Sequence, residues 1–280
     1  MAVHHAHAKP VSAVTLADAS AEPRLPRGKD LNGVKFPTLR YAPLAGQTIV
    51  SGVTSDDVIQ GTLGDCFFLS SLAALAHVRP DLVDQAIRDN LDGTWTVTLY
   101  RTTGRAVDVR VDAAFPVTPA GDLPFARGLD PAELWPEVFE KAYAKLRGGY
   151  TVINAGGFAS DALATLTGHA AHTHTLAALS DDAAWKILTD SLGAGLPVVT
   201  GTPFARELRK RTGRPDMAGL IDDHAYALLH AYERGGRRFV ILYTPLSPAD
   251  AGYSKTEPRT IELPLEDWRR FFDDVSVGTL

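Results

Sequence analysis

QGTLGDCFFLSS, residues 60–71, contains Cys66, the only cysteine in the 280-residue chain. Asp65, just before it, is a residue type that caps helices, so a helix should begin at Cys66 and run to about Ala76. The helix sequence, CFFLSSLAALA, is apolar on nearly every face, which predicts that the helix is buried. A lone cysteine at such a position is either a small buried hydrophobe or a nucleophile. The stretch by itself leaves both interpretations open.

The position of Cys66 at a helix start suits a nucleophile. A thiolate attacks a carbonyl carbon far better than a thiol does, so a catalytic cysteine needs a lowered pKa. The first turn of a helix has unpaired N–H groups and a partial positive charge, and both stabilise an anion. We therefore expect Cys66 to be partly ionised near neutral pH. Gly61 and Gly64 permit close backbone approach, and Gln60 offers an amide donor for the oxyanion that forms on attack.

A cysteine nucleophile also needs a base, and His224 is the best-placed histidine. Two-lobed cysteine enzymes have a histidine roughly 130–150 residues after the cysteine. His224 lies slightly farther along and begins the strand pattern HAYALLHAY. The other histidines fit less well, because they lie at a helix end, in a polar loop without an acidic or thiol partner, or deeper along the same strand: His77, His169, His172, His174 and His230.

Composition narrows the class of protein. The chain is 45% apolar and 22% charged, as soluble globular proteins are, and its net charge is −5. No basic field is therefore expected to attract nucleic acid or an anionic membrane. No stretch is long and apolar enough for a transmembrane segment, and the first residues lack the pattern of a signal peptide. These features favour a cytoplasmic enzyme and give no indication of the oligomeric state.

The pattern along the chain predicts a tail and two lobes. Residues 1–29 are rich in Ala, Pro, Ser and charge without periodicity, which predicts a mobile tail. Residues 30–157 should form a mainly helical lobe with the cysteine, and residues 158–280 a β-rich lobe with most of the histidines. The cleft between two such lobes is the natural place for a site.

Several elements can be predicted inside each lobe. In the first lobe, residues 94–101 and 106–111 alternate as a hairpin, and a helix should start at Asp130-Pro131 and end at Gly148-Gly149. In the second lobe we expect a helix over 180–192, strands over 196–202, 224–233 and 237–244, a helix over 265–272 and a closing strand.

Long stretches of the chain resemble the conserved motifs of the calpain family of cysteine proteases. QGTLGDCFFLSSLAALA resembles the cysteine motif, and ELWPEVFEKAYAKLRGGY resembles a second conserved stretch. DDHAYALLHAYE with the later RRFVILYTP is similar to the histidine motif, and LPLEDWRRFFDDVSV to the closing segment. The order and spacing agree over about residues 30–280. The resemblance implies an α+β, papain-like fold in two subdomains with an interlobe cleft, and endopeptidase activity on polypeptide substrates.

The resemblance also implies roles for individual residues. Cys66 would be the nucleophile, His224 the general base and Gln60 an oxyanion donor. Gly156 and Gly157 match the loop that runs along the substrate backbone in family members.

A calcium site in the first lobe is implied as well, and it would assist closure of the cleft. Its ligands would be the carbonyls of Val50 and Gly52 and the carboxylates of Asp57 and Glu140, a set of hard oxygens that suits Ca²⁺. Without the resemblance, Asp57 and Glu140 would be interpreted as ordinary surface charge.

The family pattern is broken after the histidine strand. The family has Asn-Pro-Trp-Gly there, whereas this chain has Thr244-Pro245-Leu246-Ser247. Thr244 replaces the asparagine that orients the histidine, and Leu246 replaces the tryptophan that shields it. The segment SPADAGYSKTEPRT is also short where family members have a second calcium loop, so no second site is expected.

These departures leave competing hypotheses. The first is a slow calpain-like endopeptidase that works through a thioacyl-enzyme. The second is a pseudoprotease that keeps the cleft to bind protein. The third is acyl transfer by a transglutaminase-like enzyme with the same thiol and histidine, which the matched motifs disfavour.

Overall fold

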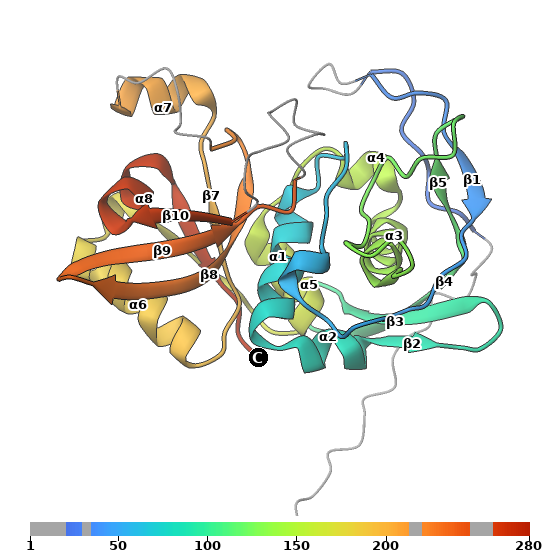
Figure 1. The fold of residues 1–280 in the computed structure, drawn as a ribbon, viewed down its shortest axis with the longest axis horizontal. Coiled ribbons are helices and arrows are strands. Elements are labelled where there is room, and N and C mark those ends of the chain that lie inside the picture. Colours follow the sequence, from blue (N-terminus) through green and yellow to red (C-terminus); the bar gives the residue numbers. More distant parts are fainter. Residues whose placement is uncertain (1–20, 30–34, 213–219, 247–259) are drawn as a thin grey trace, which may run out of the picture.

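The computed structural model describes residues 21–29, 35–212, 220–246 and 260–280. Figure 1 shows two halves side by side, with helix α1 (Cys66–Val78) between them. Helices and antiparallel sheets occur in both halves, which confirms the α+β class. Among the described residues, no single helix is long and apolar enough to cross a membrane; only α1 and α2, which meet at a bend of 116°, reach that length and composition when taken together.

The first half is built around α1 and a second helix, α3. Ten residues of α1 are buried, as its sequence predicted. Phe68 of α1 stacks on Tyr143 of α3, with ring centroids 3.9 Å apart. The remaining elements of this half surround the two helices: α2 (Pro80–Ala86), α3 (Trp135–Arg147), α4 (Tyr150–Ile153), α5 (Ala159–Thr167), the 3-10 turn η1 (Ser55–Asp57), β1 (Arg40–Pro43), β2 (Ile87–Asp89), β3 (Thr94–Tyr100), β4 (Ala106–Asp112) and β5 (Ala114–Val117).

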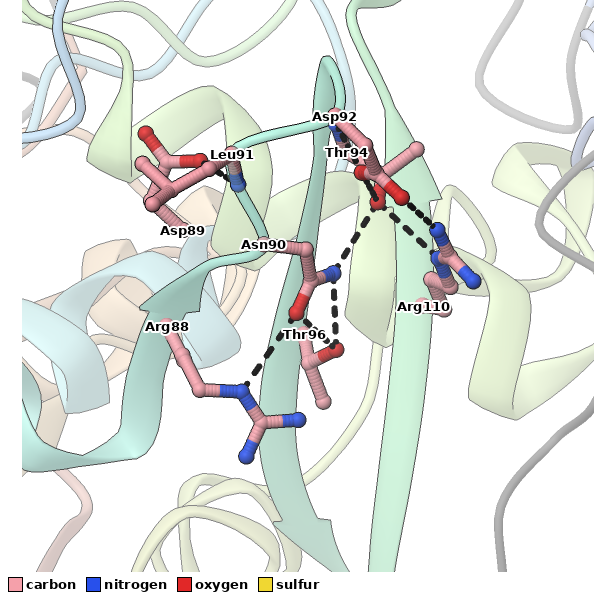
Figure 2. Close-up of polar contacts among 8 residues, drawn as sticks. All are labelled: Arg88, Asp89, Asn90, Leu91, Asp92, Thr94, Thr96 and Arg110. Carbon is pink, nitrogen blue, oxygen red and sulfur yellow. Dashed lines mark hydrogen bonds and ion pairs between the residues drawn. The ribbon is translucent and has the colours of Figure 1, made fainter.

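The predicted hairpin is confirmed as β3 and β4, which form a three-stranded sheet with β2. The inward residues of both strands are buried, so the alternation in the sequence correctly identified the core face. Polar side chains hold the turn between β2 and β3 (Figure 2): Asn90 Nδ2 donates to the hydroxyls of Thr94 and Thr96, and Arg110 Nε donates to Thr94. These contacts fix the outer end of the sheet.

The second half is a six-stranded antiparallel sheet in the order β10-β9-β8-β7-β11-β6. Its side chains alternate between two cores. One face packs on α6 and α8, through residues such as Tyr226 and Trp268, while the other face adds Val199, Ala227 and Tyr243 to the core around α1. The elements are β6 (His172–Thr175), the turn η2 (Leu176–Ala178), α6 (Asp181–Gly193), β7 (Val198–Gly201), α7 (Ala205–Thr212), β8 (Ala225–Arg234), β9 (Arg237–Tyr243), β10 (Thr260–Pro264), α8 (Leu265–Phe271) and β11 (Asp274–Val277).

The start of α3 differs from the prediction, which placed it at Asp130. The helix begins at Trp135, because the residues before it pair with another segment instead. Leu134 and Trp135 donate their backbone N–H groups to the carbonyls of Gln47 and Thr48. Tertiary hydrogen bonds therefore hold the segment as a turn that bridges to Gln47, where local capping signals favoured a helix.

The structure differs from the predictions at the end of the tail and in the histidine segment. Residues 1–20 of the predicted tail lie outside the described residues, but residues 21–29 are packed: Glu22 pairs with the buried Lys141 at 2.9 Å, and Thr151 N donates to Arg24 O. Helix α5 contributes Leu163 to the core around α1, which residues of both halves share, so the boundary between residues 157 and 158 stays a prediction. The segment predicted as a polar histidine loop is in fact strand β6.

Candidate active site

The cysteine loop is held by close backbone contacts that only glycine permits. A Cβ atom at Gly61 would lie 2.1 Å from Pro124 O, and one at Gly64 would lie 2.7 Å from Asn154 O. Gly64 N also donates to Asn154 Oδ1 at 2.9 Å. The loop therefore delivers Cys66 to the first position of α1, as predicted. Asp65 precedes it, but its side chain makes no capping bond, contrary to the prediction.

His224 comes from the other half, directly before β8. Its backbone pairs with Thr202, since Thr202 N donates to His224 O at 2.9 Å and His224 N donates to Thr202 Oγ1 at 3.1 Å. The imidazole lies edge-on against the ring of Tyr226, with centroids 5.0 Å apart. The thiol of Cys66 in turn has a hydrogen bond with the backbone of Ala225, the residue after His224. The two candidate catalytic residues therefore come from different halves and line the same cleft.

Thr244 occupies the position of a residue that orients the imidazole. Its Oγ1 lies 2.9 Å from His224 Nε2, and both side chains are buried. The contact through Nε2 leaves Nδ1 as the nitrogen available for the thiol proton. Leu246 N donates to the same hydroxyl oxygen at 3.3 Å, so the oxygen is shared.

A cleft of about 870 Å³ opens over this pair. Residues of both halves line it, including Leu246 and most of the predicted catalytic and substrate-binding residues: Gln60, Cys66, Gly156, Gly157 and His224. A Cβ atom at Gly157 would lie 2.6 Å from the ring of Phe67, so this position requires glycine. Gly156 has a φ of +83° and open space in place of a side chain, which suits the edge of a substrate channel.

Gln60 lies at the cleft, and both its backbone and its side chain form hydrogen bonds there. Its backbone N donates to Pro245 O at 2.6 Å, which connects the cysteine loop to the segment after β9. Its side-chain Nε2 donates to Leu63 O at 2.6 Å. The amide nitrogen has two hydrogens, so one remains available for an oxyanion while the other is donated to Leu63.

The protonation states differ from the prediction of a partly ionised thiol. Burial raises the pKa of Cys66 to about 12, and the nearby carboxylates of Asp65 and Asp223 add to that rise. Burial also lowers the pKa of His224 to about 3. Desolvation outweighs the helix start, because a buried charge loses its hydration whatever its sign. The resting pair is a neutral thiol and a neutral imidazole.

Glu140 does not lie at the predicted calcium loop. It is buried in the first half, where its Oε1 accepts from Ala126 N at 2.9 Å and its carboxyl hydrogen-bonds to that of Asp65. Burial and the mutual repulsion raise the pKa of Glu140, and burial raises the pKa of Asp65 to about 7. The pair thus shares a proton beneath the cysteine loop, and the assignment of Glu140 as a ligand does not fit.

Glu133 is the carboxylate that the structure brings to this loop. Its Oε1 accepts from Val50 N at 2.8 Å, and the charge of Asp57 contributes to raising its pKa, although burial is the larger cause. Its Oε2 is buried without a partner among the described residues. Gly52 turns the loop with a φ of +95°. The sequence contained Glu133 seven residues before Glu140, but its position in the first turn of the predicted helix gave no indication of a ligand.

The loop predicted to bind calcium has few side chains that could serve as metal ligands. Within the described parts of the chain, no group of three or more His, Cys, Asp or Glu side chains is arranged to hold a metal ion. Asp57 and Glu133 provide two carboxylates, so any hard cation here also needs backbone carbonyl oxygens and water. An orphaned carboxylate oxygen beside a second carboxylate fits that type of ligand set.

Comparisons with known proteins agree with this geometry. The family model described as calpain family cysteine protease matches residues 39–243. The chain belongs to the calpain family. The calpain-type cysteine protease ADL1 of Oryza sativa subsp. japonica is 33% identical over 200 residues, 69% of this chain and 9% of that protein. Calpain-5 of Caenorhabditis elegans is 35% identical over 195 residues, and the calpain-2 catalytic subunit of Gallus gallus 31% over 192.

These relatives are much longer than the matched region. The match covers 64% of this chain and 29% of the nematode calpain-5, and 66% of this chain and 26% of the chicken calpain-2 subunit. The chain therefore corresponds to less than a third of either relative, in the part that contains the cysteine and histidine motifs.

Proposed function

We propose that this chain is a calpain-like cysteine endopeptidase with a papain-like, two-lobed active site. The observation that supports the proposal best is the pairing of Cys66, at the start of α1, with a His224 that is oriented through Nε2 by Thr244. Both side chains line one cleft between the halves. A thiol, a base and an orienting group in this relation are what nucleophilic catalysis on a carbonyl needs.

The proposed reaction has two stages. His224 Nδ1 accepts the thiol proton while Sγ of Cys66 attacks the peptide carbonyl carbon, and the oxyanion accepts hydrogen bonds from the first-turn N–H groups and from the second N–H of Gln60 Nε2. The tetrahedral intermediate expels the amine, which takes the proton from the imidazolium, and leaves a thioester. Water then attacks the thioester with His224 again as the base, and this releases the acid and restores the thiol.

The neutral resting pair fits a mechanism in which proton transfer accompanies attack. A preformed thiolate–imidazolium pair would be strongly nucleophilic, but desolvation disfavours it in this structure. We propose that substrate binding or movement of the two halves changes this environment. The result is a slow enzyme compared with one whose ion pair is already formed.

We further propose that calcium binds the first-half loop and supports the active arrangement. The ligands would be the carbonyls of Val50 and Gly52 with the carboxylates of Asp57 and Glu133. A bound divalent cation would neutralise the negative charges of these two neighbouring carboxylates. Because the loop leads through η1 into the Gln60 loop, binding would stiffen the segment that holds the oxyanion donor.

Digestion of an unfolded protein tests the protease proposal. We expect the wild type to cleave a reduced, carboxymethylated protein in the presence of calcium, and Cys66→Ala to leave it intact. Chelator should slow the wild type. If the wild type and Cys66→Ala behave alike under both conditions, the proposal is wrong.

A thermal-shift titration separates the two assignments for the calcium carboxylate. Calcium should raise the melting temperature of the wild type and of Glu140→Gln, since a ligand that binds only the folded state stabilises it. Asp57→Asn and Glu133→Gln should abolish the gain. A gain that survives Glu133→Gln but is lost in Glu140→Gln would instead support the sequence-based assignment.

A pseudoprotease is the second candidate, and two observations favour it. Thr244 stands where the family has asparagine, and burial keeps both members of the catalytic pair neutral. Such a protein would retain the cleft to bind polypeptides. Binding of an unfolded protein without cleavage, equal in wild type and Cys66→Ala, would support this candidate.

A further inference from the structure

A smaller pocket opens beside the catalytic cleft. It has a volume of about 180 Å³ and shares Cys66, Gly157 and His224 with the large cleft. From there it extends toward the six-stranded sheet, where its lining includes Phe158, Thr173, Gly201, Asp274 and Ser276. A substrate that runs along Gly157 to reach Cys66 would therefore place a side chain at the mouth of this pocket.

Asp274 lies at the sheet side of the pocket because of its register in β11. It pairs with Gly201 of β7 and with Thr175 of β6. Its neighbours Val275 and Val277 belong to the core under α6 and α8, so alternation directs Asp274 to the opposite face of the sheet. Gly201 leaves the space beside the carboxylate free, since even a Cβ atom there would come within 3.5 Å of both carboxylate oxygens.

The pocket is negative and has no internal cation. No Lys, Arg or His side chain within the described parts of the chain forms an ion pair with Asp274, and no Lys or Arg lines the pocket. The second carboxylate of the lining is Asp223. His224 also lines the pocket, but its lowered pKa of about 3 keeps it neutral. The charge of Asp274 is therefore available to a group that enters from outside.

Other lining residues suit a long cationic side chain. Phe158 is 76% exposed at the pocket, so its ring face can stack on a guanidinium or ammonium group. The hydroxyls of Thr173 and Ser276, which also line the pocket, lie 2.9 Å apart and offer acceptor oxygens. A pocket with an aromatic ring, hydroxyl oxygens and a carboxylate suits the hydrogen-bond donors of an Arg side chain better than it suits an apolar side chain.

We propose that Asp274 makes this pocket a subsite for an Arg or Lys side chain of the polypeptide substrate, close to the scissile bond. The proposal rests on the proposed protease function and names the substrate class for it. Asp274 thus acts as a specificity residue and takes no part in bond breaking.

The preference of the pocket for an Arg or Lys side chain should be present at high pH and lost at low pH. Burial, with a smaller contribution from Asp273, raises the pKa of Asp274 to about 6. Above that value the carboxylate is charged and attracts a cation, and below it the protonated group loses the attraction. The other titratable groups of the lining are Asp223, Cys66 and His224. Cys66 and His224 stay neutral around this pH, so the change is assigned to the carboxylates.

A binding experiment with Cys66→Ala tests the subsite without catalysis. Fluorescein-labelled peptides of Ala, Gly and Leu contain a single Arg that is moved from position to position, and a matched set contains the neutral isostere citrulline. By fluorescence anisotropy at pH 7.5, one Arg position should bind about tenfold more tightly than citrulline, as expected for a charge-assisted hydrogen bond. Asp274→Asn should remove that ratio, whereas Asp273→Asn, which removes the neighbouring charge, should keep it.

Cleavage of the same peptides by the wild type separates this proposal from the protease proposal. A tenfold higher kcat/KM for Arg than for citrulline, lost in Asp274→Asn and below about pH 6, supports both. Cleavage with no Arg preference overturns the subsite alone. An Arg preference in binding without any cleavage keeps the subsite and overturns the protease. Equal binding of the Arg and citrulline peptides at every position overturns the subsite.

Discussion

At the residue scale, Thr244 is the position at which we expect the proposed catalytic arrangement to be weakened while its geometry stays in place. An asparagine side-chain oxygen only accepts, so it holds the imidazole with a proton on Nε2 and leaves Nδ1 free as the base. A threonine hydroxyl can donate as well as accept. If Thr244 donates to Nε2, the imidazole proton moves to Nδ1, and the histidine no longer accepts the thiol proton. The 2.9 Å contact is compatible with both states, so under the protease proposal we expect only part of the protein to be poised for reaction.

The variant Thr244→Asn should therefore raise the turnover number. Loss of an orienting residue can cost about 10⁴-fold in a serine-type triad, and a cysteine enzyme should lose less, so we expect a gain of roughly tenfold or more. KM should change little, because Thr244 is buried behind His224 and does not line the cleft. Adding Leu246→Trp should help further by excluding water from the bond. Steady-state kinetics on a peptide substrate provide the measurement, and an unchanged kcat in both variants would contradict the argument.

The raised pKa of Cys66 gives a second prediction at the residue scale. The thiolate is the form that alkylates, and its fraction rises about tenfold per pH unit below the pKa. With a pKa of about 12, iodoacetamide labelling should keep accelerating from pH 6 to pH 10 without a plateau. Mass spectrometry of the labelled peptide measures the rate, and no other cysteine interferes. A plateau near neutral pH that disappears in His224→Ala would show a preformed ion pair instead.

At the scale of elements, α1 and α3 are joined by a buried pair of carboxyl groups. Asp65 precedes α1, Glu140 lies within α3, and both pKa values are raised mainly by burial. Between about pH 4 and pH 7, these carboxyl groups therefore stay protonated in the folded protein but are ionised in the unfolded chain. Stability should fall as pH rises through this window, by about 1.4 kcal/mol per pH unit for each retained proton.

Replacing one carboxyl of the pair should flatten this dependence. In Glu140→Gln, the amide oxygen can still accept from Ala126 N, and the amide nitrogen can donate to an ionised Asp65. We expect a shallower fall in the free energy of unfolding between pH 5 and pH 7, and a gain of roughly 1–2 kcal/mol over the wild type at pH 8. Urea denaturation measures both. Glu266→Gln, which changes an exposed carboxylate on α8, should keep the wild-type slope; an identical slope in Glu140→Gln would contradict the shared-proton account.

For the whole molecule, the two halves share one core. Val199, Ala227 and Tyr243 of the second half pack in the cluster around α1. Tyr243 also donates to Val58 O at 2.8 Å, and Ser70 of α1 donates to Ala225 O at 2.7 Å. Because the catalytic pair lies at this boundary, the same contacts that join the halves also fix the distance between thiol and base.

The halves should consequently unfold together. We expect one calorimetric transition, and Ser70→Ala should lower its midpoint as a whole, because it leaves the buried Ala225 carbonyl without its donor at a cost of about 1–3 kcal/mol. Ser71→Ala is a matched control, since that hydroxyl bonds mainly within α1, to Phe67 O at 2.7 Å. Two separate transitions in the wild type, or equal effects of the two variants, would contradict this view.

The sequence alone determined the elements whose signals are local. The buried helix after Cys66, the alternating hairpin and the strands around Gly235-Gly236 all follow from periodicity and turn residues, and the structure confirms them. The motif order predicted the family, which the comparisons confirm, and the spacing predicted His224 as the partner of Cys66. The helix and the strands depend on residues that are close together in the sequence, so local sequence patterns are sufficient to predict them.

Only the tertiary structure decided the features that depend on contacts across the fold. Backbone bonds to Gln47 and Thr48 hold the segment before Trp135 as a turn, and this places Glu133, and not Glu140, at the loop proposed to bind calcium. Burial from both halves, and not the helix start, sets the protonation of Cys66. Strand register brings Asp274 beside the cysteine, although the two are far apart in sequence. Desolvation and strand pairing arise only when distant segments meet, so no local pattern records them.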